Sequence, residues 1–417
     1  MRTPESFVSD SLKSQPFSGN FWPFAWDSLM NLKHGLHLAY CTNVHRGETW
    51  AQTFGTLEQF TLPVRDRVAP GKPFAIGLRL GAQTARELSD PATLAAFRRW
   101  LDREHCYVFT INGFPHGRFH GGRVKEQVYL PDWTSDDRVA YTNLLFDLLA
   151  ELVPAGVEGS VSTVPASYKE FIKSEEQVTA MRRNVWRSVE HIAEVSERTG
   201  KSLHLGLEPE PLCYLETSAE MVRFYEQLAA DRPGDPRLGR HLGVNYDTCH
   251  LAIEFEDPHE AVRRYRHAGV KISKLHFSNA LKVRPTPDSL AALQPFDDIV
   301  YFHQVISRSA DGTIRKFKDL DVALAAAARN PPPVTDEWRI HFHIPLHCEP
   351  TALYGNTADH LLGVMDELAA DPTLCSHLEM ETYTWEVMPG EMKRDIVEQL
   401  AGEYAWTLRE LAQRGLA

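Results

Sequence analysis

The stretch LHLGLEPEP at residues 203–211 decides how the chain is interpreted, together with LGVNYDTCH at 242–250 and KISKLHFSN at 271–279. Each is a short apolar run of strand length that ends in an ionisable side chain: Glu208, Asp247 and His276. Short apolar runs bounded by longer helical patterns are typical of buried parallel strands. Working outward from these runs, we find the same alternation along most of the chain.

Eight strands alternating with helices predict a (β/α)8 TIM barrel, because this is the element count of that fold. The predicted strands are His37–Thr42, Phe74–Leu80, Tyr107–Asn112, Gly159–Val164, Leu203–Glu208, Leu242–Asp247, Ile272–Phe277 and Leu378–Thr382. The predicted helices are Thr93–Glu104, Ser135–Leu152, Ser174–Thr199, Ser218–Ala230, Pro258–Ala268 and Lys393–Arg414. A doubly wound open sheet would give a similar pattern. No GxGxxG turn follows an early strand, which excludes its usual dinucleotide-binding version.

The domain organisation that we predict is an N-terminal arm or extension over residues 1–35 and one barrel over 36–417. The arm is rich in Ser, Pro, Phe and Trp, and a protein that begins at Met30 is an alternative. An insertion at about 279–338 follows strand seven. In it, Ile299–Ser307 and Thr313–Lys318 flank a turn signal and predict a hairpin. We expect this insertion either to cover the barrel mouth or to be a surface decoration.

The amino-acid composition limits which classes of partner the chain can bind. Of 417 residues, 44 are Lys or Arg and 56 are Asp or Glu, so the formal net charge is −12. Because phosphate backbones require basic stripes, we predict no nucleic-acid partner. No apolar run approaches the ~20 residues of a membrane span, and no secretory signal is evident, so we predict no membrane insertion. The six cysteines form no CxxC pair, which argues against disulfides and a thiolate zinc site and favours a cytoplasmic location. The sequence leaves the oligomeric state open.

Potential metal ligands gather at the strand ends. They are Glu208 and Glu210, Asp247 and His250, His276, the three histidines of RIHFHIPLH (339–347), and Glu379 and Glu381. In a barrel these positions converge on one small volume, where carboxylates repel one another unless a cation neutralises them. A lone strand histidine is more often structural, but a series of this kind predicts a site for Zn, Mn, Co or Fe(II). His341 and His343 would share one strand face.

The order Glu, Asp-x-x-His, His, His-x-His, Glu resembles the xylose-isomerase-like TIM barrels, a superfamily that includes sugar isomerases, ketose 3-epimerases and endonuclease IV. The resemblance implies one or two divalent ions (Zn, Mn or Fe). It implies a common metal site formed by Glu208, Asp247, His276 and Glu381. It also implies an extra site formed by His250, His341 and His343. The likeness of Glu381-Thr382 to the family's Glu-Thr pair favours Glu381 over Glu379.

This chain departs from the family in two places. His341 stands where the family usually has Asp, which makes the extra site more typical of zinc or iron. Strand four ends without a histidine, which puts a three-metal site and a role on DNA in doubt. The strings LAYCTNVHRGETW (38–50), TINGFPHGRFHG (110–121) and FHIPLH (342–347) are similar to a narrower group, the metabolite traffic proteins of the Ebo cluster. That similarity implies a secondary-metabolite pathway.

We therefore predict a metal-dependent isomerase or epimerase that acts on a polyhydroxylated small molecule. By the resemblance, Glu208 and Glu381 lie on opposite sides of the site, so that one removes a proton and the other returns it. A dinuclear-metal hydrolase acting on a phosphoester is the alternative, and a non-catalytic metabolite-binding barrel is the third. Phe114 and Trp50 are further candidates for an apolar wall. The predicted substrate-binding residues are Asn112, His116, Glu216, His303 and Trp385.

Overall fold

Eight parallel strands form a closed barrel in the computed structural model, which describes residues 32–117, 125–298, 300–390 and 393–417. Their order around the barrel is β1–β13–β7–β6–β5–β4–β3–β2. The strands are β1 (His37–Cys41), β2 (Phe74–Arg79), β3 (Cys106–Asn112), β4 (Gly159–Thr163), β5 (Leu203–Leu207), β6 (Leu242–Asp247), β7 (Lys271–Phe277) and β13 (His377–Met380). Each overlaps one of the predicted strands, so the predicted (β/α)8 fold is confirmed.

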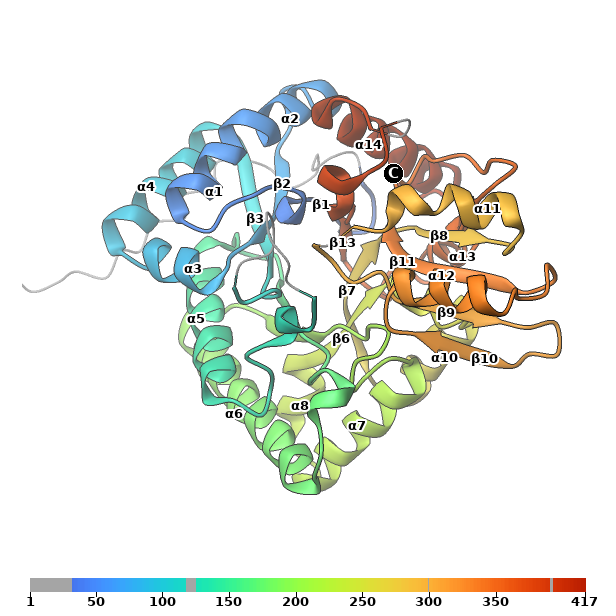
Figure 1. Ribbon diagram of the computed structural model, residues 1–417. Helices are drawn as coiled ribbons and strands as arrows, with labels where there is room; N and C mark the ends of the chain where they lie inside the picture. The colour runs from blue at the N-terminus through green and yellow to red at the C-terminus, as the bar shows by residue number, and fades with distance from the viewer. Residues whose placement is uncertain (1–31, 118–124, 299, 391–392) are drawn as a thin grey trace, which may run out of the picture.

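Helices surround the barrel (Figure 1) and bury their apolar faces against the strands. They are α1 (Trp50–Thr56), α2 (Leu62–Val68), α3 (Ala82–Leu88), α4 (Pro91–Arg103), α5 (Asp136–Leu152), α6 (Glu175–Thr199), α7 (Ser218–Asp231), α8 (Pro236–His241), α9 (Thr248–Ile253), α10 (Pro258–His267), α13 (Ala358–Ala370) and α14 (Ile396–Gln413). The helices α3, α8, α9 and α13 were not predicted, and neither were α1 and α2. Their stretch holds Gly55, Pro63 and several threonines, which are poor helix formers. A capping box between Thr49 and Gln52 starts α1 despite that composition.

A second sheet lies between β7 and β13 in the sequence, to the right of the barrel in Figure 1. Its strand order is β10–β9–β11–β8–β12, with an apolar cluster of its own. The strands are β8 (Ala280–Val283), β9 (Val305–Arg308), β10 (Ile314–Phe317), β11 (Glu337–His343) and β12 (Gly355–Asn356), and the helices are α11 (Pro287–Ala292) and α12 (Leu320–Arg329). β9 and β10 pair antiparallel where the hairpin was predicted, although Ile299 lies outside the described residues. The sheet extends past residue 338, the predicted end of the insertion, and β11 carries His341 and His343 into the site.

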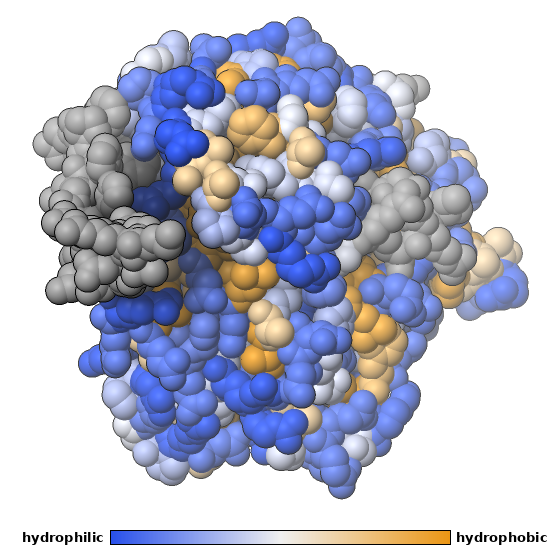
Figure 2. Space-filling view, turned by 90° about the vertical axis from the view of Figure 1, so that its left-hand side faces the viewer, coloured by the Kyte–Doolittle hydropathy of each residue, from blue (hydrophilic) through white to orange (hydrophobic). Residues whose placement is uncertain are grey.

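The outer surface of the helices is mostly hydrophilic on the face that Figure 2 shows. The helix α4 illustrates why: it buries Phe97, Trp100 and Leu101 and turns its charged residues outward. No helix in the described ranges is both long and apolar enough to cross a membrane. Of the predicted N-terminal arm, residues 1–31, including Met30, lie outside the described residues.

Candidate metal centre

Four of the predicted ligands meet at the C-terminal ends of the barrel strands. One ligand atom from each of Glu208, Asp247, His276 and Glu381 lies within 4.8 Å of the others. The central atom is Nδ1 of His276, at 3.0 Å from Glu208 Oε1, 3.1 Å from Glu381 Oε2 and 3.5 Å from Asp247 Oδ2. All four side chains are buried. The structure thus brings together the set that the resemblance implied, and its role as a metal site stays a prediction.

Asp247 is held in place by the start of the next helix. Its Oδ1 caps α9 by accepting hydrogen bonds from the backbone N–H groups of Cys249 (2.8 Å) and His250 (3.1 Å). The hydroxyl of Ser278 donates to the same oxygen at 2.5 Å. Its other oxygen, Oδ2, is buried and has no hydrogen-bond partner among the described residues. One oxygen therefore orients the carboxylate, and the second faces the site.

Glu379 lies one strand repeat deeper than Glu381 and has a different set of partners. It accepts hydrogen bonds from Lys274 Nζ at 2.6 Å and Asn112 Nδ2 at 2.8 Å, and its Oε2 lies 3.0 Å from His276 Nε2. Nε2 of His276 donates to Glu379, so Nδ1 faces Glu208, Asp247 and Glu381, where it carries a hydrogen in the absence of an ion and would present its lone pair to a bound one. A carboxylate that orients a ligating histidine in this way is usual in metal sites. The geometry therefore favours Glu381 as ligand and Glu379 as its support.

The barrel makes room for Glu379 by placing a glycine opposite it. A Cβ atom on Gly77 would lie 1.7 Å from Glu379 Oε1. Burial raises the pKa of Glu379, but Lys274 and His276 outweigh it and bring the pKa to about 2. Burial likewise lowers the pKa of His276, yet the facing carboxylates, Glu381 foremost, hold it well above its usual value. The buried carboxylates of this region are thus balanced by cationic neighbours.

The three histidines of the implied extra site lie beside the first group: His250 and His343 meet Asp247, and His341 and His343 meet Cys249. Each histidine has its Nδ1 at a carbonyl oxygen: His250 at Pro209 O (3.0 Å), His341 at Gln304 Oε1 (2.7 Å) and His343 at Glu381 O (3.0 Å). Because a carbonyl oxygen only accepts, each Nδ1 carries the hydrogen and each Nε2 presents a lone pair. The Nε2 atoms of His250 and His341 lie 3.1 Å apart, and that of His343 has no partner among the described residues. The Nε2 lone pairs of His250 and His341 would repel each other, and a proton or a cation between them would remove this repulsion.

Gln304 fixes the orientation of His341, and no sequence motif pointed to this residue. Its amide nitrogen donates to Tyr129 OH at 3.1 Å and to Pro211 O at 3.3 Å, so its oxygen must face His341. Gln304 follows the buried His303 just before β9, in the insertion, where no ligand motif marks it. Asp247 belongs to the group with His250 and His343 as well as to the first group. It is thus placed between the two groups.

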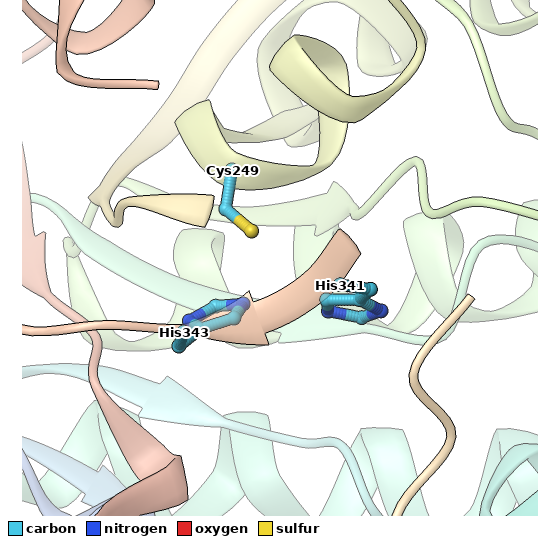
Figure 3. A group of neighbouring side chains, drawn as sticks. All are labelled: Cys249, His341 and His343. Atoms are coloured by element: carbon cyan, nitrogen blue, oxygen red, sulfur yellow. The ribbon is translucent and has the colours of Figure 1, made fainter. Parts of the chain in front are cut away.

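Cys249 lies beside the same histidines. Figure 3 shows its sulfur pointing from α9 toward the strand β11, which carries His341 and His343, and one ligand atom of each lies within 4.8 Å of the others. Burial raises the pKa of the Cys249 thiol well above its usual value, and the side chain packs with Ile253 and Ile306. It therefore acts here as a small apolar residue. The sequence contains no CxxC motif, so nothing in it indicated that a cysteine would lie so close to two potential ligands.

A pocket opens over both groups of ligands. Its lining combines aromatic rings with hydroxyl and amide groups: Asn43, Asn112, Phe114, Pro115, Lys125, Val128, Tyr129, Glu208, Glu210, His250, Tyr301, Phe302, His341, Glu381 and Tyr383. Glu210, expected among the strand-end carboxylates, accepts a hydrogen bond from Tyr129 OH at 2.6 Å. Burial raises the pKa of Glu210 to about 7. The tyrosines come from loops and the insertion, which strand-end reasoning does not reach.

Of the five predicted substrate-binding residues, Asn112 lines the pocket and the other four do not. The ring of His116 packs edge-on against Tyr141. Glu216 forms ion pairs with Lys316 and Lys169. These contacts satisfy both side chains away from the pocket.

The remaining candidates are likewise engaged elsewhere. His303 is buried, with its Nδ1 3.0 Å from His341 O and its Nε2 at Asp298, so it supports β11 from behind. Trp385 donates its Nε1–H to Arg394 O at 3.0 Å. Of the two aromatic candidates, Phe114 lines the pocket, whereas Trp50 packs against Phe97.

Solved structures with this architecture are known. A xylose isomerase-like TIM barrel protein from Mycobacterium smegmatis, in complex with magnesium, matches with a TM-score of 0.53 and 15% identity, over 92% of this chain and 99% of that chain. The chain has the xylose isomerase-like TIM-barrel fold. An L-ribulose 3-epimerase matches with a TM-score of 0.47 and 15% identity, over 90% of this chain and 94% of that chain.

Comparisons of the sequence, unlike those of the structure, identified no relatives. No family model matches the chain. No curated protein matches it either. The narrower resemblance to the Ebo-cluster proteins stays a prediction.

Proposed function

We propose that this chain is a metal-dependent isomerase or epimerase acting on a polyhydroxylated small molecule. The observation that carries the proposal is the group of Glu208, Asp247, His276 and Glu381 at the base of a pocket lined by hydroxyl, amide and aromatic groups. The two parts suit one another, since a sugar-like substrate needs hydrogen bonds for its hydroxyls and a flat apolar face for its carbons.

The residues present fit a divalent ion. Asp247 Oδ2 and His343 Nε2 are buried without hydrogen-bond partners among the described residues, which is unusual unless a cation or water faces them. The mixed oxygen and nitrogen donors suit Zn, Mn or Fe. The magnesium in the M. smegmatis protein supports a divalent ion in this fold. When bound, the ion would polarise two adjacent substrate oxygens and acidify the C–H bond between them.

Glu208 and Glu381 are placed to move the proton. They follow β5 and β13, which are separated by β6 and β7 around the barrel, so the two carboxylates reach the site from different sides. Asn43 donates to Glu381 Oε1 at 2.6 Å, and Glu208 Oε1 lies 3.0 Å from His276 Nδ1. One glutamate removes the proton from carbon on one face, and the other returns it on the opposite face.

The pocket lining favours a neutral substrate over a phosphoester. Among the described residues that line it, the one Lys or Arg is Lys125, and its ammonium is 2.5 Å from Asp319. Tyr129, Tyr301 and Tyr383 offer hydroxyl groups instead. Phe114 and Phe302 offer ring faces.

A dinuclear-metal hydrolase is the second candidate, and the histidines favour it. The three Nε2 lone pairs of His250, His341 and His343 would hold a second ion next to Asp247, which an epimerase does not require. Two ions sharing a bridging hydroxide suit hydrolysis. The resemblance to the Ebo-cluster proteins extends either proposal to a cytoplasmic role in a secondary-metabolite pathway.

The test is solvent-deuterium incorporation. The chelator-stripped protein, reloaded with Zn, Mn or Fe(II), is incubated with a panel of ketoses in heavy water and followed by NMR. An epimerase gives a product with inverted stereochemistry and one deuterium at the same carbon, and Glu208→Gln abolishes both. A protein that exchanges no C–H on any member, yet hydrolyses nitrophenyl phosphates, would contradict the proposal and support the hydrolase.

A further inference from the structure

We propose that Glu158, His204 and His377 form a second, separate binding site for a divalent transition-metal ion, at the N-terminal end of the barrel. His204 is the second residue of β5, His377 is the first residue of β13, and Glu158 precedes β4. His204 and His377 each lie four residues before Glu208 and Glu381 on the same strands. At the usual rise of about 3.3 Å per residue, this separates the two ends by about 13 Å.

The three side chains converge across the barrel interior. One ligand atom from each lies within 4.8 Å of the others, and His204 Nε2 is 3.3 Å from Glu158 Oε2. Two ligands of a tetrahedral zinc ion are also about 3.3 Å apart. β5 and β13 are not neighbours in the barrel, yet the rings of His204 and His377 lie 5.2 Å apart. Binding an ion at this point therefore requires only small movements of the three side chains toward one another.

Hydrogen bonds fix His377 in the form that binds metal. Its Nδ1 lies 2.8 Å from Ser160 Oγ, and the hydroxyl of Ser160 donates its hydrogen to Thr110 Oγ1 at 2.8 Å. Nδ1 of His377 must therefore be the donor, and Nε2 carries a lone pair. That Nε2 atom is buried and has no hydrogen-bond partner among the described residues. A buried acceptor left without a partner is rare and calls for a ligand or water.

His204 is buried beside it. Its Nδ1 is 2.6 Å from Ser273 Oγ, and its Nε2 faces Glu158 Oε2 at 3.3 Å. Both imidazoles are about 1% exposed. Burial lowers the pKa of each below its usual value, which keeps the rings neutral, as a metal ligand must be.

Glu158 gives the site its negative charge and lies where the site opens to solvent. Its side chain is 39% exposed, so an ion can reach the histidines past it. Lys271 Nζ lies 2.8 Å from its Oε2, and Ser202 donates to its Oε1 at 3.1 Å. Without an ion, Lys271 balances the carboxylate. With one, these donors orient the carboxylate, as is common for ligating carboxylates. Two imidazoles, one carboxylate and an open position suit Zn²⁺, Co²⁺ or Ni²⁺ rather than Mg²⁺.

The experiment is zinc binding to the chelator-stripped full chain, measured by equilibrium dialysis and elemental analysis. We expect Glu158→Gln and His377→Gln each to bind one zinc ion fewer per chain than the wild type. The matched control is Glu151→Gln, a half-exposed glutamate that pairs with Arg98 and should bind as the wild type does. Glu158 is partly exposed, so its variant tests the proposal even if His377→Gln fails to fold. Equal zinc content in the wild type, Glu158→Gln and Glu151→Gln would overturn the proposal.

Thermal denaturation with and without zinc gives an independent readout. Zinc should raise the Tm of the wild type more than that of Glu158→Gln, because the ion ties β4, β5 and β13 together and binds the folded state only. Lys271→Met removes the competing ammonium and should tighten zinc binding. If the group is only an ion-pair network, Lys271→Met lowers the Tm by the same amount with and without zinc.

Discussion

The two ends of the barrel interior use the same residue types for different purposes. At the C-terminal end, β13 presents Glu381 to His276 beneath an open pocket, whereas at the N-terminal end it presents His377 to His204. Between them, Glu379 on the same strand pairs with Lys274 at 2.6 Å. Inward positions two residues apart thus form three levels. The cluster at the C-terminal end is a candidate catalytic site because it lies beneath a pocket that a substrate can enter.

Removing the middle level should have the largest effect on the fold. Lys274 is 1% exposed, so Lys274→Met leaves Glu379 as a buried carboxylate without its ammonium partner. Breaking a buried pair costs about 3–5 kcal/mol of unfolding free energy. Denaturant unfolding measures this. The double variant Lys274→Met/Glu379→Gln should recover most of the lost stability. Equal destabilisation of the single and the double variant would show that the two side chains do not depend on one another.

Asp247→Ala should release metal from the C-terminal end of the barrel and leave metal binding at the N-terminal end unchanged. The variant loses a carboxylate shared by both ligand groups, so we expect tightly bound metal to be released and turnover to fall at least ~100-fold. It also loses the cap of α9, which lowers stability by about 1 kcal/mol. Elemental analysis and thermal denaturation check this.

Two controls separate these causes. Asp247→Asn keeps a capping oxygen and should lose metal with less effect on the Tm. Glu210→Gln, in the same pocket, should keep both the metal and the Tm. Equal metal content in Asp247→Ala and Glu210→Gln would contradict the ligand assignment.

The sequence predicted the barrel because eight apolar runs alternated with amphipathic helices. The convergence of strand ends indicated one region of potential metal ligands, and the family resemblance divided those ligands into two groups. It did not predict the residues that act through tertiary contacts. Gln304 and Tyr129 belong to the insertion and to the loop after β3, and no periodicity places them over the mouth. His116, Glu216, His303 and Trp385 were expected at the substrate, but their partners lie elsewhere. Chemistry of a residue type alone does not reveal which partner it finds.

The same limit explains the N-terminal end. His204 and His377 begin strands, where strand-end reasoning sees no site, and Glu158 precedes β4. They meet only because the closed barrel brings β5 and β13 face to face. The resemblance already favoured Glu381 over Glu379, and the structure adds the partners in which these two inward-facing glutamates differ.

Gln304→Leu should weaken the second ligand group without touching the first. The change removes the oxygen that holds His341 Nδ1 at 2.7 Å, and loss of such a support typically costs about 10–100-fold in metal affinity. Cobalt titration followed by visible absorption measures it. Gln294→Leu, at an exposed glutamine of the insertion, is the control. Unchanged cobalt affinity in Gln304→Leu would remove the support for a second ion.

Glu403→Gln tests how one buried carboxyl, which accepts a hydrogen bond from Thr382 beside Glu381, contributes to the pH dependence of stability. Glu403 lies on α14 outside the barrel, and burial raises its pKa to about 8. A carboxyl with a raised pKa stabilises the fold below its unfolded pKa of about 4.5, and this contribution is lost as pH rises toward 8. The Tm of the wild type should therefore fall across this range. Glu403→Gln should flatten the fall, and an identical pH profile of the two proteins would contradict this role.

Anomalous X-ray diffraction from crystals soaked in zinc, recorded on both sides of the zinc absorption edge, would locate bound ions in the barrel. We expect one peak enclosed by Glu208 Oε1, Asp247 Oδ2, His276 Nδ1 and Glu381 Oε2, and a second among the Nε2 atoms of His250, His341 and His343. An ordered crystal with no peak within bonding distance of His276 Nδ1 would contradict this expectation.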